Sequence, residues 1–205
     1  VLARNRALHS WANVATLAEF TTLPGAQRLE QRVGPEIWAR LERAAATTGV
    51  PVSAIARARE WTVGVWLAQA TMTQLGFRET LGIDNHFLEQ SDARHVIALE
   101  TLRTQLEALS SLTDDDARLF VDDALPEFES GGRRLLALMT AWQSGDAFGL
   151  QRLLEAQTQE AKLSVRIQRA IIDQRNLRML SGLEAHLDAA DTGSVAFVVV
   201  GAGHM

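Results

Sequence analysis

Cysteine and tyrosine are absent from the 205 residues, and Lys162 is the single lysine. Without cysteine the chain has no disulfide, no thiol nucleophile and no zinc or iron–sulfur centre built on thiolates. Lys162 follows no glycine-rich loop, so a phosphate-binding role of the P-loop type is not indicated. The longest fully apolar run is 195–200, far shorter than the roughly 20 residues that a membrane-spanning helix needs. We therefore expect no membrane span in this segment.

Acidic residues outnumber basic residues in the chain, 25 to 20. The net charge is −5, with 47% hydrophobic and 22% charged residues. This balance is typical of a folded domain, and the acidic total gives no indication of a nucleic-acid partner. Carboxylates gather between Asp114 and Glu129, which we interpret as the solvated face of a helix.

Most of the chain shows helical periodicity. Apolar residues recur every four positions over 26–48, and the Gly34-Pro35 pair divides this stretch into two helices. The segment 61–75 is apolar nearly all round, which predicts a central helix. Thr113 is placed to cap the acidic helix, and 162–187 predicts one long helix.

Two short apolar segments, 95–100 and 195–200, read as buried strands. Strands alternating with helices favour an α+β (mixed α/β) fold, with a small, partly parallel sheet covered by a large, mainly helical layer. We expect one domain over 1–205. Because so apolar a strand is normally an interior one, we also expect an excerpt of a longer protein, with an N-terminal strand region and a C-terminal end missing.

Candidate site residues lie where the two predicted strands end. Gly201 and Gly203 form a flexible turn before His204, and Glu100 ends the other strand. Parallel neighbouring strands would bring Glu100 and His204 to one edge of the sheet. Together they suit either metal ligation with an activated water or general acid–base chemistry without a metal. Alternatively, Glu100 is a first-turn acid of the helix that starts near Thr101.

Two further groups of polar residues are candidates. Asn176 falls within the apolar stripe of the long helix, where it either pins a loop or points into a site. Its neighbour Arg175 could orient a carboxylate with two hydrogen bonds, or face water. Asp84 and His86 could serve together in a turn, although a helix-capping role for Asp84 is the simpler interpretation.

In order and spacing these segments resemble the TraB/GumN family, which is related to the TIKI-type metalloproteases. The similarity runs from about Leu23 to Met205. It is carried by short motifs: LPGAQRLEQRVGPEIWARL from Leu23, Gly82-Ile83-Asp84 with His86-Phe87, Ala98-Leu99-Glu100-Thr101 with Gln105-Leu106, Ala141-Trp142-Gln143-Ser144-Gly145-Asp146, Asp173-Gln174-Arg175-Asn176, and Val200-Gly201-Ala202-Gly203-His204.

The resemblance implies a metal-dependent hydrolase of peptides or proteins. His204 with Gly201 matches the second of two Gly-x-x-His motifs, and Glu100 matches a strand-end glutamate. His204 and Glu100 would then hold a divalent ion (Zn, Mn or Co), and Arg175 would orient the substrate. Gly201, Gly203, Asn176, Asp84 and His86 would support the substrate or the site. A periplasmic or envelope location is implied in the same way.

One implied feature is missing, because no histidine of this chain matches the first Gly-x-x-His motif: His9 follows Arg6 where a glycine would stand. A lone histidine and glutamate would hold a divalent ion weakly, since a catalytic zinc usually has three protein ligands. The alternative is therefore a non-catalytic protein that binds or sequesters a peptide or small ligand on the same fold. A helical interaction module that forms a homo-oligomer is a third possibility.

Overall fold

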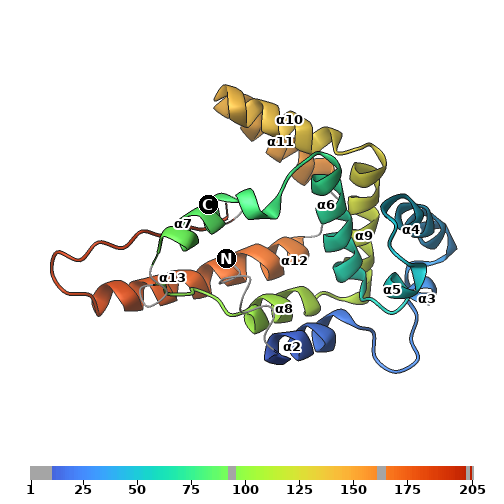
Figure 1. The fold of residues 1–205 in the computed structure, drawn as a ribbon, viewed down its shortest axis with the longest axis horizontal. Helices are drawn as coiled ribbons and strands as arrows, with labels where there is room; N and C mark the ends of the chain where they lie inside the picture. Colours follow the sequence, from blue (N-terminus) through green and yellow to red (C-terminus); the bar gives the residue numbers. More distant parts are fainter. Residues whose placement is uncertain (1–10, 92–95, 161–164, 202–203, 205) are drawn as a thin grey trace. The chain divides into compact units, whose positions relative to one another are not determined.

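A computed structural model describes residues 11–91, 96–160, 165–201 and 204 (Figure 1). The chain divides into two compact units. Unit 1 comprises residues 1–20, 79–112 and 165–205, and unit 2 comprises residues 21–78 and 113–164. Each unit is therefore assembled from segments that lie far apart in the sequence.

Unit 2 is a set of helices. In chain order they are α3 (Leu29–Val33), α4 (Pro35–Thr48), α5 (Val52–Ile55), α6 (Glu60–Gln74), α9 (Asp114–Glu129), α10 (Arg133–Ser144) and α11 (Ala147–Glu160). Pro35 begins α4, and Gly34 before it has a φ of 82°, a conformation that favours glycine. Thr113 caps α9 by accepting a hydrogen bond from the backbone N–H of Asp116. The predicted helix break and cap are both confirmed.

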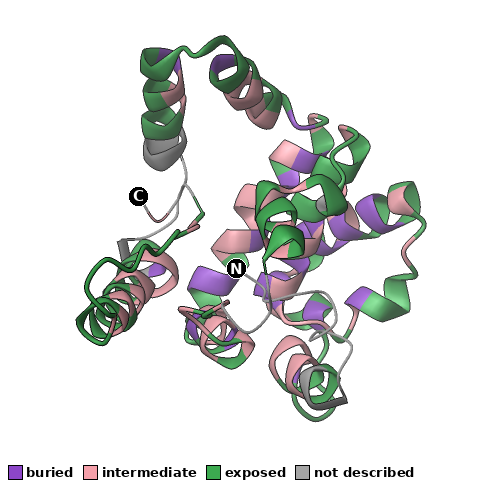
Figure 2. Ribbon diagram, turned by 60° about the vertical axis from the view of Figure 1, so that its left-hand side comes forward, coloured by how far each residue is buried: buried purple, intermediate pink, exposed green. Residues whose placement is uncertain are grey.

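The core of unit 2 lies between α4, α6 and α9 (Figure 2). Its fully buried side chains include Leu41, Leu67, Leu125 and Val121. Helices α6 and α9 approach closely at Gly64, because a Cβ atom there would lie 2.4 Å from Cδ1 of the Phe120 ring. The prediction that 61–75 is a central helix is confirmed, and its glycine is a packing requirement.

Several carboxylates of α9 are paired with arginines. Arg40 binds Glu129 through Nη2 at 2.7 Å, and Arg32 bonds both Asp114 and the buried Glu60. The Arg40 hydrogen bond lowers the pKa of the Glu129 carboxyl below its usual value. The acidic face of α9 is thus not only solvated, because ion pairs with arginines on α3 and α4 attach α9 to these two helices.

Unit 1 contains α2 (Trp11–Thr21, whose last residue belongs to unit 2), η1 (Glu79–Leu81), α7 (Ile83–Gln90), α8 (Leu102–Ser110), α12 (Val165–Gln168), η3 (Arg169–Asp173) and α13 (Gln174–Asp188). The segment η3 is a π-helical turn that continues into α13. Helix α8 begins with a capping box formed by Thr101 and Thr104. The two non-helical segments 96–100 and 195–200 belong to the same unit.

The α+β prediction is wrong: the protein is mainly α. Within the described ranges there is no strand, and the single β-bridge joins Thr22 and Ala58. Residues 96–98 and 195–200 are neither helical nor in turns, 99 and 100 form a bend, and no described backbone hydrogen bond pairs the two segments; His95 lies outside the described residues. A strand is completed only by a neighbouring strand, whereas a helix bonds within itself. In the part of the chain that is described, no helix is long and apolar enough to cross a membrane.

Candidate functional site

A groove of about 730 Å³ runs through unit 1 and contains most of the predicted site residues. Its size falls in the range of small-molecule and peptide sites. Its walls come from α7, α13 and the two non-helical segments. The lining residues are Asp84, Phe87, Leu88, Ser91, 96–100, Arg175, Met179, Leu183, His186, 195–201 and His204.

One face of α13 forms the floor of this groove. Arg175, Met179, Leu183 and His186 line it, and their spacing of four, four and three residues keeps them on one side of a helix. All four are partly buried, whereas Leu177 and Leu180 on the other faces are more than half exposed. The helix therefore presents a polar group at each end of an apolar stripe.

Glu100 and Arg175 form a bidentate ion pair at one end of the groove. Arg175 donates from Nη2 to Oε2 of Glu100 at 2.7 Å, and from Nε to both carboxylate oxygens at 3.0 and 3.1 Å. The Glu100 side chain is 3% exposed, so few other groups can reach it. Arg175 also donates from Nη1 to the carbonyl oxygen of Ile171, within the π-helical turn η3.

Asn176 holds His204 by two hydrogen bonds. Its Nδ2 donates to the backbone carbonyl of His204 at 3.3 Å, and its Oδ1 lies 2.7 Å from Nδ1 of the imidazole. Because the amide nitrogen is used by the carbonyl, Oδ1 must accept, so Nδ1 of His204 carries the proton. That tautomer leaves the lone pair on Nε2, the nitrogen that can take a proton or bind a metal.

The electrostatics of the groove keep this imidazole neutral. Burial lowers the pKa of His204 below 6.5, the nearby Arg175 guanidinium lowers it further, and the Glu100 carboxylate opposes both effects. Lone pair and neutral charge together are what a general base needs near pH 7.

Replacing Asn176 by aspartate is expected to raise the pKa of His204, because a carboxylate accepting from Nδ1 stabilises the imidazolium ion. The Cε1–H resonance of His204 in an NMR titration should then move to its protonated position at higher pH than in the wild type. Gln174→Glu adds the same charge at an exposed position of α13 and should shift the titration less, owing to solvent screening. A wild-type midpoint at or above 6.5 would contradict the assigned environment.

The structure brings together Glu100, Arg175, Asn176 and His204, with Gly201 and Asp84 also at the groove or its ends. His86 does not line the groove, and its Nε2 lies 2.8 Å from Nε2 of Gln90 on α7. Gly203 lies outside the described residues. The residues meet through α13, and the parallel sheet edge from which their proximity was predicted is not formed.

The sequence indicated no role for His186, and it placed Met179 and Leu183 in the apolar stripe of the long helix without assigning them to a groove. Their signal was present, because the spacing from Arg175 through Met179 and Leu183 to His186 marks one face of a helix. What the sequence could not supply was the opposite wall, where Phe87 on α7 contacts Phe197 at 4.8 Å between ring centroids.

The described residues do not by themselves fit a complete metal centre. Both oxygens of Glu100 accept from Arg175, and within the described ranges no three His, Asp or Glu side chains are grouped to hold an ion. A catalytic zinc commonly has three protein ligands. At the end of the groove near Glu100, the described residues present Nε2 of His204 as a candidate ligand.

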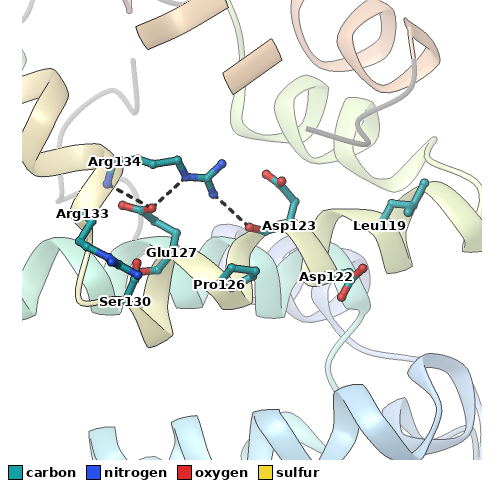
Figure 3. Close-up of a pocket in the computed structure, with 8 residues that line it drawn as sticks. All are labelled: Leu119, Asp122, Asp123, Pro126, Glu127, Ser130, Arg133 and Arg134. Carbon is teal, nitrogen blue, oxygen red and sulfur yellow. Dashed lines mark hydrogen bonds and ion pairs between the residues drawn. The ribbon is translucent and has the colours of Figure 1, made fainter. Parts of the chain in front are cut away.

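Unit 2 contains a second, charged cavity of about 530 Å³ between α9 and the start of α10 (Figure 3). Here Glu127 accepts hydrogen bonds from Arg134 Nε at 2.9 Å and from the backbone N–H of Leu135 at 3.0 Å. These contacts hold α10 to α9 across the Gly131-Gly132 turn. The contacts of Glu127 therefore connect the two helices at this cavity, and the acidic and basic groups that line it largely bond to one another.

The ionised carboxylate of Asp123, which lines this cavity, is expected to lower the stability of unit 2. Desolvation raises the pKa of its carboxyl, with Arg134 opposing this and Asp122 and Glu127 adding to it. Because folding raises this pKa, the ionised carboxylate destabilises the folded state. This cost is absent at pH values below the pKa of the unfolded chain and complete above the pKa of the folded chain. Asp123→Asn should thus stabilise unit 2 at pH 7, by less than about 1 kcal/mol because the group is part-exposed. Urea unfolding should show the gain at pH 7 and its loss at pH 3.

Comparison with known proteins identifies the family of this chain. Residues 3–205 match the TraB/PrgY/gumN family. The chain belongs to this family. It is 29% identical over 125 residues to the uncharacterized protein YbaP of Escherichia coli K12 and equally to that of Shigella flexneri, covering 60% of this chain and 47% of theirs.

The resemblance to TraB/GumN proteins predicted from the motifs is thereby confirmed. The aligned region spans about half the length of the curated YbaP relatives it matches. No solved structure matches. The comparisons thus establish the family. The contacts among Glu100, Arg175, Asn176 and His204 are known from this structure alone.

Proposed function

We propose that this TraB-family chain is a hydrolase of peptides or proteins whose reacting groups lie at the His204 end of the groove. The observation that carries the proposal is the pair of hydrogen bonds between Asn176 and His204, which leave Nε2 unprotonated. A positioned neutral imidazole beside an arginine is a common arrangement for activating water next to a carbonyl group.

In this proposal His204 is the base and Arg175 orients the substrate. Nε2 takes a proton from water, the hydroxyl adds to the carbonyl carbon, and the same proton passes to the leaving nitrogen as the C–N bond breaks. Nη1 of Arg175 donates to Ile171 and Nη2 donates to Glu100, which leaves one further N–H on each nitrogen. These two N–H groups can donate to the carbonyl oxygen of the substrate. Glu100 holds Arg175 in position.

The divalent ion predicted from the family resemblance stays a prediction. Native mass spectrometry of the 205-residue chain with and without zinc tests it. Because no group of three His, Asp or Glu side chains among the described residues could hold an ion, we expect no adduct that survives dialysis. A stoichiometric adduct that disappears in His204→Ala would contradict this expectation and support a metal-dependent hydrolase.

The function itself is tested by turnover of a library of quenched fluorescent peptides, with and without zinc or manganese. His204→Ala should abolish turnover, and Asn176→Leu should reduce it and move its acid limb. Arg178→Ala, an exposed position on α13, is the matched control and should behave like the wild type. Unchanged turnover in His204→Ala would overturn the proposal.

One observation favours the alternative, a protein that binds a peptide or small ligand without cleaving it. The engaged Glu100 and the incomplete ligand set provide a recognition site as readily as a catalytic one. Saturable peptide binding without turnover in any metal condition would establish this alternative.

A further inference from the structure

We propose that the π-helical turn η3 is a positioning element of the site: it takes up one extra residue and thereby turns Arg175 and Asn176 toward their partners at the reacting end of the groove. This inference deepens the proposed function, on which its turnover readout rests. It assigns a role to a turn whose own side chains do not line the groove.

The extra residue is visible in the backbone of η3. The backbone N–H of Gln174 donates to the carbonyl oxygen of Arg169, five positions earlier. A regular α-helix closes each turn with a hydrogen bond over four positions, so η3 contains one residue more than a turn of the helices on either side. Turns of this kind are uncommon and are frequently found at functional sites.

The extra residue changes which side chains share a face with Ile167 of α12, which is fully buried. Successive residues of an α-helix are rotated by about 100°. In an uninterrupted α-helix Arg175 and Asn176 would point about 80° and about 180° away from Ile167. When the turn absorbs one residue, these angles become about 20° and about 80°, so both side chains lie on the buried side.

The burial along α13 follows this shifted register. Met179 and Leu183 line the groove and are partly buried, and the shifted register places them about 20° and about 60° from Ile167. Leu177 and Leu180 are 66% and 51% exposed, and they lie about 180° and about 120° away. In an uninterrupted helix the exposed Leu177 would point closer to the direction of Ile167 than Met179 would.

The two contacts at the reacting end depend on this rotation. Arg175 reaches the Glu100 carboxylate and Asn176 reaches His204, and these two neighbours follow η3 directly. Arg175 is also bonded to the turn itself, because its Nη1 donates to the carbonyl oxygen of Ile171 at 3.1 Å. A rotation of α13 at η3 would therefore break both contacts together.

The test changes the number of residues in the turn. Deleting the exposed Arg169 leaves a regular α-helix with Arg175 and Asn176 in their present directions, so the fold and the site should both be retained. Inserting an alanine between Arg169 and Ala170 adds a second extra residue, which the turn cannot absorb without rotating α13 by about 100°. Arg169→Ala, which leaves the length unchanged, is the matched control.

The contacts are read by NMR without any substrate. In the wild type the Nε–H of Arg175 donates to Glu100 and the Nδ1–H of His204 donates to Asn176, so both protons should exchange slowly with water. We expect slow exchange in the Arg169 deletion and in Arg169→Ala, and exchange at least ten-fold faster for both protons in the insertion variant. Turnover of the quenched fluorescent peptides should stay within three-fold of wild type in the deletion and fall at least 100-fold in the insertion.

A length-restoring variant guards against an insertion that merely unfolds the chain. Deleting the exposed Gln174 together with the alanine insertion returns the wild-type number of residues between Ile167 and Arg175, and should restore slow exchange of both protons. Circular dichroism and the urea midpoint establish which variants are folded. Slow exchange in the insertion variant, or fast exchange of both protons in the Arg169 deletion, would overturn the inference.

Failure of this inference is distinguishable from failure of the proposed function, because exchange is recorded without turnover. A chain that shows the expected exchange pattern but cleaves no peptide contradicts the hydrolase and leaves the role of η3 standing. A chain whose turnover survives the insertion contradicts the role of η3 and leaves the hydrolase standing.

Discussion

Glu100→Ala is expected to destabilise unit 1 by about 3 kcal/mol, because breaking a buried ion pair leaves the surviving charge without its partner. Glu100 is 3% and Arg175 19% exposed, so water compensates the guanidinium only in part. The effect should appear as faster hydrogen exchange at the backbone amides of α13 and as a lower urea midpoint. Loss of the Arg175 position should also abolish peptide turnover.

A matched control for this variant exists in the same unit. Glu19 and Arg103 form an ion pair at 3.1 Å in which both side chains are at least half exposed. Glu19→Ala should cost no more than about 1 kcal/mol, as exposed pairs do. If both substitutions cost the same, the Glu100–Arg175 pair is not the buried contact described. The double variant Glu100→Leu/Arg175→Met should recover part of the stability, since no charge is then left unpaired.

Gly64→Val is expected to be the most damaging single change in unit 2. A Cβ at this position lies 2.4 and 2.8 Å from two atoms of the Phe120 ring, so α6 and α9 must separate or the ring must leave its place. Overpacking of this kind costs roughly 1–3 kcal/mol for a small addition and more for a branched side chain. Thermal unfolding should show a fall well outside the error of the measurement.

The physical cause can be isolated with two further variants. Gly182→Ala, at a mid-helix glycine of α13 with nothing within 4 Å of the added Cβ, should instead stabilise its helix by about 0.5–1 kcal/mol. Phe120→Ala removes the ring that Gly64→Val meets, so the double variant should be less destabilised than the sum of the single variants. Full additivity would show that the two residues do not share the contact.

The helices of unit 2 were predictable because their signals are local. The Gly34-Pro35 break, the cap at Thr113 and the all-apolar stretch of α6 are set by residues within a few positions of each other. The sequence could not predict which carboxylates of α9 form ion pairs with arginines. Arg32 and Arg40 reach it from helices that lie about 80 to 90 residues earlier in the chain.

The sheet was predicted wrongly for a physical reason. The apolar composition of 96–100 and 195–200 favours strands, and both segments are non-helical in the structure. A strand, however, exists only when a second backbone offers its N–H and C=O groups, and composition carries no information on that partner. The helical segments needed no partner, and the helix break at Gly34-Pro35, the central helix over 61–75 and the cap at Thr113 were confirmed.

By itself the sequence determined the helical segments, their caps and breaks, the family, and the residue types able to act on a substrate. The tertiary structure alone decided how those residues meet. Arg175 reaches Glu100 across 75 positions and Asn176 reaches His204 across 28. These contacts depend on where α13 lies relative to Glu100 and His204. Local patterns record which face of a helix is apolar, whereas the choice of what covers that face is made by packing.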